Sequence, residues 1–268
     1  MSTDLAEALG PLRADPRRAA ILCDVDGTLA PIVDRPQDAR VGEEVSRLLG
    51  ALGRRYALVA CVSGRSVSEV RRLVGVEAIA YVGSHGAEIL PAGCERPQVP
   101  EAFAEWEGSV GDFVRGRAEE PPLRAAKVRL EDKGAIKAFH WRGAPDEDAA
   151  EQLLQDVAGE ARAAGLEVHW GRMVLEVRPP VPVDKGQALR TLVERGKVRS
   201  GLYGGDDVTD LDAFDALDAL IASGDLDHAV RVGVRSAEGP AAIVQRADVV
   251  VEGVEGFAAV LSALAQDR

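Results

Sequence analysis

Residues 20–29 read AILCDVDGTL, an apolar run that ends in two aspartates, Asp24 and Asp26. Aspartate is rare in strands and costly to bury without a partner, so two carboxylates at the end of a buried strand need compensation, most simply by a cation. The pattern also fits a strand followed by a tight turn in which Asp26 and Gly27 are ordinary turn residues. Which reading holds depends on the other side chains that reach the same place.

The composition is that of a globular protein with a hydrophobic core. Of the 268 residues, 46% are hydrophobic and 28% are charged, which fits one large domain or two modest ones. The formal net charge of −12 argues against partners such as nucleic acid or an anionic membrane. The start of the chain lacks the apolar core of a signal peptide, and no stretch reaches membrane-spanning length, so we expect a soluble, cytoplasmic protein. The three cysteines are widely spaced, which disfavours a disulfide framework or a zinc site.

Apolar runs and helical patterns alternate along most of the chain. Strands are expected at 21–24, 57–63, 79–83, 201–204, 229–234 and 248–251. Helices are expected at 41–52, 67–74, 185–195, 209–220 and 254–265, where apolar residues recur every three or four positions. This alternation predicts an α/β domain with a doubly wound parallel sheet covered on both faces. Ligands bind at the edge of such a sheet where the carboxyl ends of the strands lie.

The region 93–180 interrupts this alternation. Helices are expected there at 100–117 and 146–164, and strands at 123–132, 135–142, 166–170 and 172–178. Two hairpins with two helices form an α+β module of their own, and the proline-containing segments on either side suit hinges. We therefore predict a catalytic core of residues 1–92 and 181–268 and an inserted α+β domain of residues 93–180.

Four groups of polar residues are expected to meet at the ligand edge of the sheet. They are Asp24 with Asp26, Ser63 with Gly64, Asp184 with Lys185, and Asp206 with Asp207. Each group also has a purely structural interpretation: a helix cap for Ser63, a solvated side chain for Lys185, and a turn with a cap for the paired aspartates. If all these roles were purely structural, four unrelated polar groups would lie at the same sheet edge by coincidence. Their shared position therefore favours one functional site.

The carboxylates in these groups suit a magnesium ion. Mg²⁺ prefers a few carboxylate oxygens and takes its remaining ligands from water and phosphate, so Asp24, Asp26 and Asp206 are candidate ligands. Asp207, and with it Asp210, would orient the metal or its waters. The ion would also keep Asp24 ionised by suppressing the repulsion among the carboxylates.

The same residues suit phosphoryl transfer. An ionised carboxylate beside a phosphoryl group is a competent nucleophile, which assigns that role to Asp24 and predicts an aspartyl-phosphate intermediate. Asp26 is the candidate general acid and base. Ser63, the backbone N–H of Gly64 and the Lys185 ammonium would bind the phosphate and stabilise charge on the transferring oxygens.

The order of these motifs resembles the haloacid dehalogenase superfamily. Its signature is a DxDGT-type first motif, a Ser or Thr second, a Lys third and a paired-acid fourth, matched here by residues 24–28, Ser63, Lys185 and Asp206-Asp207. The resemblance implies a doubly wound core in which a C2-type α/β cap, inserted between the second and third motifs, forms the specificity wall over the leaving group. The region 93–180 lies at that position.

Further segments resemble the trehalose-6-phosphate phosphatases within this superfamily. They are residues 24–32, 63–65, 83–89, 131–134, 174–179 and 205–210. The resemblance implies Mg²⁺-dependent hydrolysis of trehalose 6-phosphate to trehalose and phosphate. Two positions depart from the family pattern: Leu211 stands where Glu is common, and Asp184 stands where Asn is more common. Both residues lie beside essential positions, so these departures concern the affinity for the metal and the detailed geometry of the site more than the activity itself.

Residues of the insertion are the candidates for sugar binding. Strand alternation gives the inserted sheet one polar face, which is either a solvated surface or a binding surface. Acidic side chains accept hydrogen bonds from sugar hydroxyls, and the resemblance selects Glu131, Lys133 and Glu176. Arg65 and His85 are further candidates, although Arg65 also suits a helix cap or a pair with an acid, and His85 also suits packing in a turn.

Other functions share parts of this pattern. A phosphatase for sucrose 6-phosphate or for glucosyl- or mannosyl-glycerate phosphate would keep every core motif. A receiver-type phosphorylation switch would need neither a cap nor Asp26 as an acid, and a catalytically silent regulatory relative is the third class. The expected partner is a small sugar phosphate, and association with a trehalose-6-phosphate synthase is an open possibility.

Overall fold

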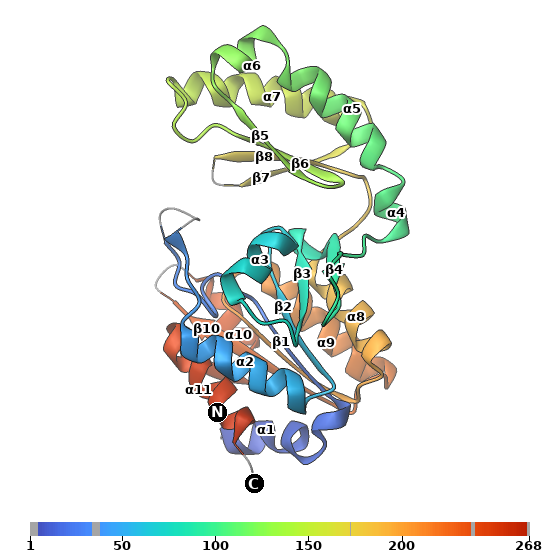
Figure 1. Cartoon of the computed structure of the whole chain (residues 1–268), viewed down its shortest axis with the longest axis vertical. Helices are drawn as coiled ribbons and strands as arrows, with labels where there is room; N and C mark the ends of the chain where they lie inside the picture. Colours follow the sequence, from blue (N-terminus) through green and yellow to red (C-terminus); the bar gives the residue numbers. More distant parts are fainter. Residues whose placement is uncertain (1–4, 34–37, 172, 237–238, 267–268) are drawn as a thin grey trace. The chain divides into compact units, whose positions relative to one another are not determined.

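The computed structural model describes residues 5–33, 38–171, 173–236 and 239–266. The chain divides into two compact units, a core unit of residues 1–98 and 183–268 and an inserted unit of residues 99–182. Each unit has its own sheet and its own hydrophobic core (Figure 1).

The core unit is built on a seven-stranded sheet with the order β11-β10-β9-β1-β2-β3-β4. Its strands are β1 (Ala19–Cys23), β2 (Leu58–Val62), β3 (Ala80–Gly83), β4 (Glu88–Leu90), β9 (Ser200–Gly205), β10 (His228–Arg235) and β11 (Val249–Glu252). Neighbouring strands are parallel except for the antiparallel pair β3 and β4. Because β1 lies between β9 and β2, crossovers run to both sides of it, and the predicted doubly wound sheet is confirmed.

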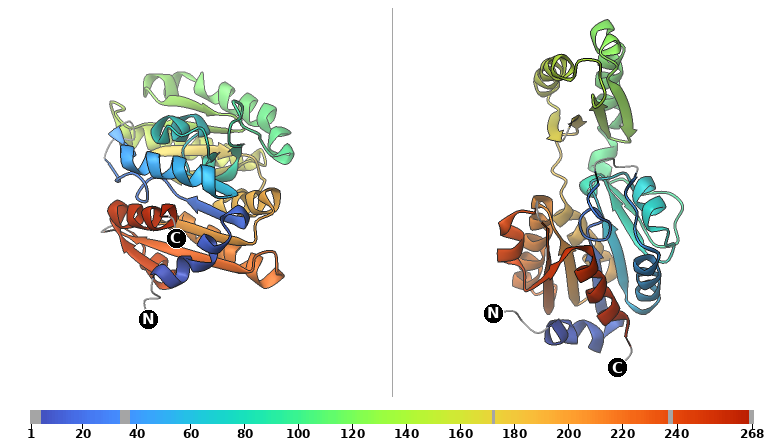
Figure 2. Two further views of the ribbon diagram at one scale, coloured as in Figure 1. Left: turned by 60° about the horizontal axis from the view of Figure 1, so that its bottom comes forward. Right: turned by 90° about the vertical axis from the view of Figure 1, so that its left-hand side faces the viewer.

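Helices cover both faces of this sheet (Figure 2). One face carries α1 (Leu5–Ala14), α2 (Glu43–Arg55), α3 (Val67–Val74) and α11 (Gly253–Ala265). The other carries α8 (Lys185–Gly196), α9 (Leu211–Ser223) and α10 (Ala241–Arg246). Alternate residues of β1 enter the two cores, Ile21 on the first face and Leu22 on the second, which explains why the strand is apolar at every position.

The inserted unit is an antiparallel sheet with helices on one face. The sheet has the order β5-β6-β8-β7, with β5 (Arg129–Lys133), β6 (Ile136–His140), β7 (Glu167–Gly171) and β8 (Val174–Arg178). The helices are α4 (Glu101–Ala104), α5 (Glu107–Ala118), α6 (Pro121–Ala125) and α7 (Glu147–Ala163). Phe139, Leu175 and Val177 pack under α5, α6 and α7, which leaves the opposite sheet face polar.

Three predicted elements of the inserted unit differ in their bounds from the structure. The strand expected at 123–132 begins only at Arg129, because Pro121 and Pro122 start the short helix α6, where proline is compatible with the first turn. The helix expected at 100–117 is divided into α4 and α5. The predicted strand at 172–178 begins at Val174 in the structure, and Arg172 lies outside the described residues.

Among the described residues, no helix combines the length and the apolar character that a bilayer crossing requires.

Candidate active site

The first motif is joined to the third by a buried ion pair. Asp24 directly follows β1, its backbone N–H donates to Gly204 O at 2.8 Å, and its side chain is buried. Lys185 is the first residue of α8, and its Nζ lies 2.7 Å from Asp24 Oδ1. Burial alone would lower the pKa of Lys185, but Asp210 and Asp24 outweigh it and raise that pKa, so the ammonium stays charged. The solvated interpretation of Lys185 is therefore wrong.

Asp184, which precedes Lys185 and departs from the family pattern, has a structural role. Asp184 is the N-cap of α8, and its Oδ1 accepts a hydrogen bond from Gln187 N at 2.7 Å. Aspartate and asparagine cap helices about equally well. The departure at Asp184 thus preserves the geometry that starts α8 at Lys185.

Asp210 is the centre of the cluster, a role that the sequence indicated only weakly. Its carboxylate is fully buried and accepts from Lys185 Nζ at 2.7 Å, Tyr203 Oη at 2.7 Å, and the backbone N–H groups of Asp206 and Asp207 at 3.0 Å each. Four donors satisfy both oxygens. A signal for this role was present in the spacing, since an aspartate three residues after the cap residue Asp207 completes a capping box.

Asp206 and Asp207 have different surroundings. Asp206 is buried, and its Oδ1 accepts from Thr28 Oγ1 at 3.2 Å. Gly27 has a φ of +88°, and a Cβ there would lie 2.0 Å from the Asp206 carboxylate, which explains the glycine after Asp26. Asp207 is exposed and caps the short helix η4 (Val208–Asp210), so the turn-and-cap interpretation holds for Asp207 and not for Asp206.

The carboxylates of Asp24, Asp206 and Asp210 fit a hard divalent cation. One oxygen from each lies within 4.8 Å of the others, and all three residues are buried. Lys185 forms hydrogen bonds with Asp24 and Asp210, and within the described residues its one positive charge faces three carboxylates, which leaves negative charge uncompensated. Burial, followed by the neighbouring Asp210, raises the pKa of Asp206 to about 7. An all-oxygen, anionic donor set of this kind suits Mg²⁺, and because Asp210 is already saturated, Asp24 and Asp206 would hold the ion most directly.

Asp26 is held by an arginine. Arg65 donates through Nε to Asp26 Oδ2 and through Nη2 to Asp26 Oδ1, both at 2.7 Å, in a bidentate pair. Such a pair fixes the plane of the carboxylate as well as its position. Of the roles expected for Arg65, pairing with an acid is therefore the one that the structure contains.

Ser63 and Gly64 follow β2, and His85, which follows β3, packs against them; its backbone N–H donates to Ser63 O at 3.0 Å. Ser63 is buried, and its Oγ accepts from Arg65 N at 3.1 Å. Ser66, with Glu69, caps α3, so the capping interpretation of Ser63 is wrong. A Cβ at Gly64 would lie 2.5 Å from His85 Nε2, which means that the imidazole lies directly against this glycine. His85 and Ser84 both have positive φ, at 58° and 51°, a strained backbone of the kind that is concentrated at functional sites.

In the inserted unit, the three predicted sugar-binding residues lie together on the polar face of the sheet. Lys133 Nζ lies 3.1 Å from Glu176 Oε1 and 3.6 Å from Glu131 Oε2. Burial alone would raise the pKa of Glu176, but Arg178 and Lys133 outweigh it and lower the pKa to about 2. Glu176 is therefore a buried, fully ionised acceptor.

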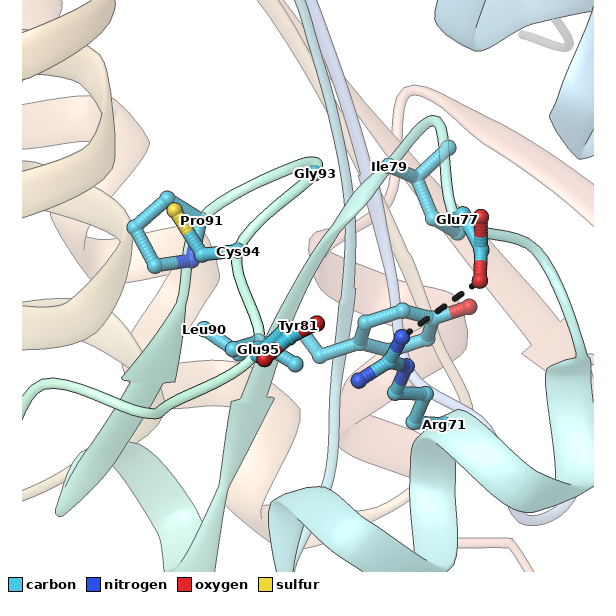
Figure 3. A pocket seen from close by; sticks show the side chains of 9 residues that line it. All are labelled: Arg71, Glu77, Ile79, Tyr81, Leu90, Pro91, Gly93, Cys94 and Glu95. Atoms are coloured by element: carbon cyan, nitrogen blue, oxygen red, sulfur yellow. Dashed lines mark ion pairs between the residues drawn. The ribbon is translucent and has the colours of Figure 1, made fainter.

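A separate pocket of the core unit does not belong to this site (Figure 3). Its volume is about 130 Å³, and an ion pair of 3.6 Å joins Arg71 and Glu77 in its wall. Its residues include Ile79 just before β3 and Leu90 at the end of the antiparallel strand β4. The predicted site lies after the other end of β3, so the pocket is at the opposite edge of the sheet.

The sequence of this chain is similar to those of known phosphatases. The model of the trehalose-phosphatase family matches residues 22–242. The trehalose-phosphate phosphatase of Mycobacterium avium is 37% identical over 211 residues, which are 75% of this chain and 52% of that protein. A protein of Mycobacterium tuberculosis named as an uncharacterized glycosyl hydrolase is 36% identical over 214 residues, which are 75% of this chain and 15% of that protein. The match therefore covers about half, or less, of the length of these relatives.

Solved structures share the fold. The C-terminal domain of a trehalose-6-phosphate phosphatase from C. albicans superposes with a TM-score of 0.70 at 22% identity, over 98% of both chains. A haloacid dehalogenase-like hydrolase from Bacteroides thetaiotaomicron superposes with a TM-score of 0.61 at 14% identity, over 91% of this chain and 98% of that chain. The predicted fold class, a haloacid dehalogenase-like α/β core with an inserted α+β unit, is confirmed.

Proposed function

This chain belongs to the trehalose-phosphatase family, and we propose that it hydrolyses trehalose 6-phosphate to trehalose and phosphate. The observation that carries the proposal is the buried cluster at the carboxyl edge of the core sheet, where Lys185 joins Asp24 to Asp210 beside Asp206. Buried carboxylates with a charged lysine are costly in a purely structural role, and they suit the binding and transfer of a phosphoryl group.

In the proposed mechanism, Asp24 is the nucleophile. Lys185 holds Asp24 Oδ1, and within the described residues Asp24 Oδ2 has no hydrogen-bond partner, so this oxygen is free to attack phosphorus. The bond from Oδ2 to phosphorus forms as the bond to the sugar oxygen breaks, giving an aspartyl phosphate. Ser63, the Gly64 N–H and Lys185 bind the phosphoryl oxygens and stabilise their charge.

Asp26 would serve both steps as acid and base. It gives a proton to the departing sugar oxygen, then takes one from the water that attacks phosphorus and releases Asp24 and inorganic phosphate. The bidentate contact with Arg65 fixes the orientation of the ionised carboxylate, the form that accepts a proton from water. In the acid step Asp26 is protonated, and one of its two contacts with Arg65 must open.

A Mg²⁺ ion held by Asp24 and Asp206, with Asp210 and the predicted residues Asp26 and Asp207 around it, would supply charge neutralisation on the phosphate when bound. Asp210 supports this arrangement by fixing Lys185 and the backbone that carries Asp206.

Sugar recognition is assigned to the inserted unit. Glu131, Lys133 and Glu176 provide charged acceptors and a donor on one sheet face, a combination that suits a molecule with many hydroxyls. Arg65 and His85 stay candidates for substrate binding. Association with a synthase and a cytoplasmic location stay predictions.

A substrate panel tests the proposal. Phosphate release should require Mg²⁺ and should be fastest with trehalose 6-phosphate, compared with sucrose 6-phosphate, glucosylglycerate phosphate and glucose 6-phosphate at equal concentration. Preference for another of these substrates would replace trehalose 6-phosphate within the same mechanism. Absence of release from every one of them, by folded protein with Mg²⁺, would contradict the proposal.

A further inference from the structure

Five side chains form a continuous chain of contacts on the polar face of the inserted sheet. His140 Nε2 lies 2.7 Å from Glu131 Oε2, and that oxygen lies 3.6 Å from Lys133 Nζ. Lys133 Nζ lies 3.1 Å from Glu176 Oε1, and Arg178 Nε donates to Glu176 Oε2 at 3.0 Å. Histidine and arginine, which the sequence did not single out, thus stand at the two ends of the predicted sugar-binding residues.

The strand register explains how these side chains meet. Ala138 of β6 is paired with Glu131 of β5 on one side and with Glu176 of β8 on the other. Because Ala138 carries only a methyl group, the longer side chains of the flanking strands reach across it. His140 is two residues further along β6 on the same face, within diagonal reach of Glu131.

The hydrogen bonds leave one carboxylate oxygen available. Glu176 uses both oxygens, Oε1 for Lys133 and Oε2 for Arg178. Glu131 uses only Oε2, towards His140 and Lys133, and Oε1 has no hydrogen-bond partner in the part of the chain that the structure describes. The Glu131 side chain is 35% exposed, so this oxygen is accessible to a ligand, whereas Glu176 is buried.

On the basis of the proposed function, we propose that His140 is a positioning residue for sugar recognition. It holds Glu131 Oε2, so that Glu131 Oε1 accepts a hydrogen bond from a hydroxyl of the sugar phosphate. Without His140 the flexible Glu131 side chain would retain only its longer contact with Lys133, and the sugar would bind to a less ordered acceptor.

The test compares His140→Ala with His140→Gln on two substrates. His140→Ala should raise the KM for trehalose 6-phosphate about tenfold, while kcat/KM for 4-nitrophenyl phosphate, which has no sugar, stays within twofold. His140→Gln keeps a donor near the position of Nε2 and should recover most of the affinity. The double variant with Glu131→Ala should be no worse than Glu131→Ala alone, because His140 acts through Glu131.

The matched control is Asp132→Asn. Asp132 forms a cross-strand pair with Lys137 between the same two strands but on the opposite face, so its loss should leave the KM unchanged. An unchanged KM in His140→Ala, or an equal loss on both substrates, would overturn the inference, as would independent effects of the two substitutions in the double variant. Wild-type protein that hydrolyses 4-nitrophenyl phosphate but not trehalose 6-phosphate would instead overturn the proposed function, and the inference with it.

Discussion

Replacing Asp210 by asparagine should destabilise the core unit far more than its similar size suggests. Asp210 Oδ1 accepts from Lys185 and Tyr203, and Oδ2 accepts from two backbone N–H groups. An amide has one acceptor oxygen and one NH₂ group, so the NH₂ must face one of the two donor pairs. Both hydrogen bonds on that side are lost, whichever way the amide is turned.

The magnitude follows from these two bonds. A hydrogen bond to a charged group contributes about 1.5–3 kcal/mol, so losing two should reduce the free energy of unfolding by about 3–6 kcal/mol. Removing one partner from a buried ion pair costs about 3–5 kcal/mol, which is the same range. Asp210→Asn removes the charge that faces Lys185. The hydrogen-bond estimate and the ion-pair estimate therefore describe the same loss of free energy of unfolding and are not added.

Urea unfolding can assign this loss to the correct unit. The chain has three tryptophans, Trp106, Trp141 and Trp170, and all lie in the inserted unit, so their fluorescence follows that unit alone. The Asp210→Asn variant should therefore shift the far-ultraviolet circular dichroism transition of the core unit without shifting the fluorescence transition.

The control for this experiment is Asp207→Asn. Asp207 is exposed, and its side chain accepts from Val208 N and from the backbone N–H of Asp210 in the capping box. Asparagine caps equally well, so the expected change is below about 0.5 kcal/mol. A loss below about 1 kcal/mol in Asp210→Asn, or equal losses in both variants, would refute the reasoning.

Three further predictions concern other parts of the chain. Folding lowers the pKa of Glu176 from 4.5 to about 2, so its ionisation stabilises the inserted unit by about 3 kcal/mol above pH 5. This stabilisation is lost as the pH falls towards 2. The free energy of unfolding of the inserted unit, followed by fluorescence, should fall over that range, and it should fall less steeply in Glu176→Gln. Gly64→Ala should reduce kcat/KM by about tenfold to a hundredfold, because the new Cβ would displace the His85 ring, and unchanged kinetics would exclude a role for this contact. Mg²⁺ at a hundred times its Kd should raise the free energy of unfolding of the core unit by about 2.7 kcal/mol in wild type and by much less in Asp206→Asn. An equal increase in both proteins would mean that Asp206 does not bind the ion.

The sequence predicted the core sheet well because its signals are local. Short apolar runs such as 57–63 indicate buried strands, and the helices between them show apolar residues at helical spacing. The antiparallel strand β4 was missed because three residues, Glu88–Leu90, are too few for a pattern. In the inserted unit, the alternation from Leu123 predicts a strand, but Pro121 and Pro122 start the helical turn α6 at that place.

Contacts between distant residues were harder to predict than the residues themselves. Asp24 and Lys185 were identified by their types and motifs. The spacing of Asp210 from Asp207 indicates only its capping-box contact, whereas its contacts with Lys185 and Tyr203 depend on the fold. Leu211, which suggested a defect in the fourth motif, begins α9 and packs against the core beneath it, so its side chain has a structural role. His140 was missed because its partner lies on the neighbouring strand, a contact that depends on register.

The central claim, that Asp24 is the nucleophile of a sugar-phosphate phosphatase, can be tested by trapping the acyl phosphate. The protein is mixed with trehalose 6-phosphate and Mg²⁺, quenched in acid and reduced with borohydride, which converts a phosphorylated aspartate to homoserine. Mass spectrometry of the peptides should find homoserine at position 24 in wild type, while Asp24→Asn shows none and releases no phosphate. Homoserine at another position, or full phosphate release by folded Asp24→Asn, would contradict the account.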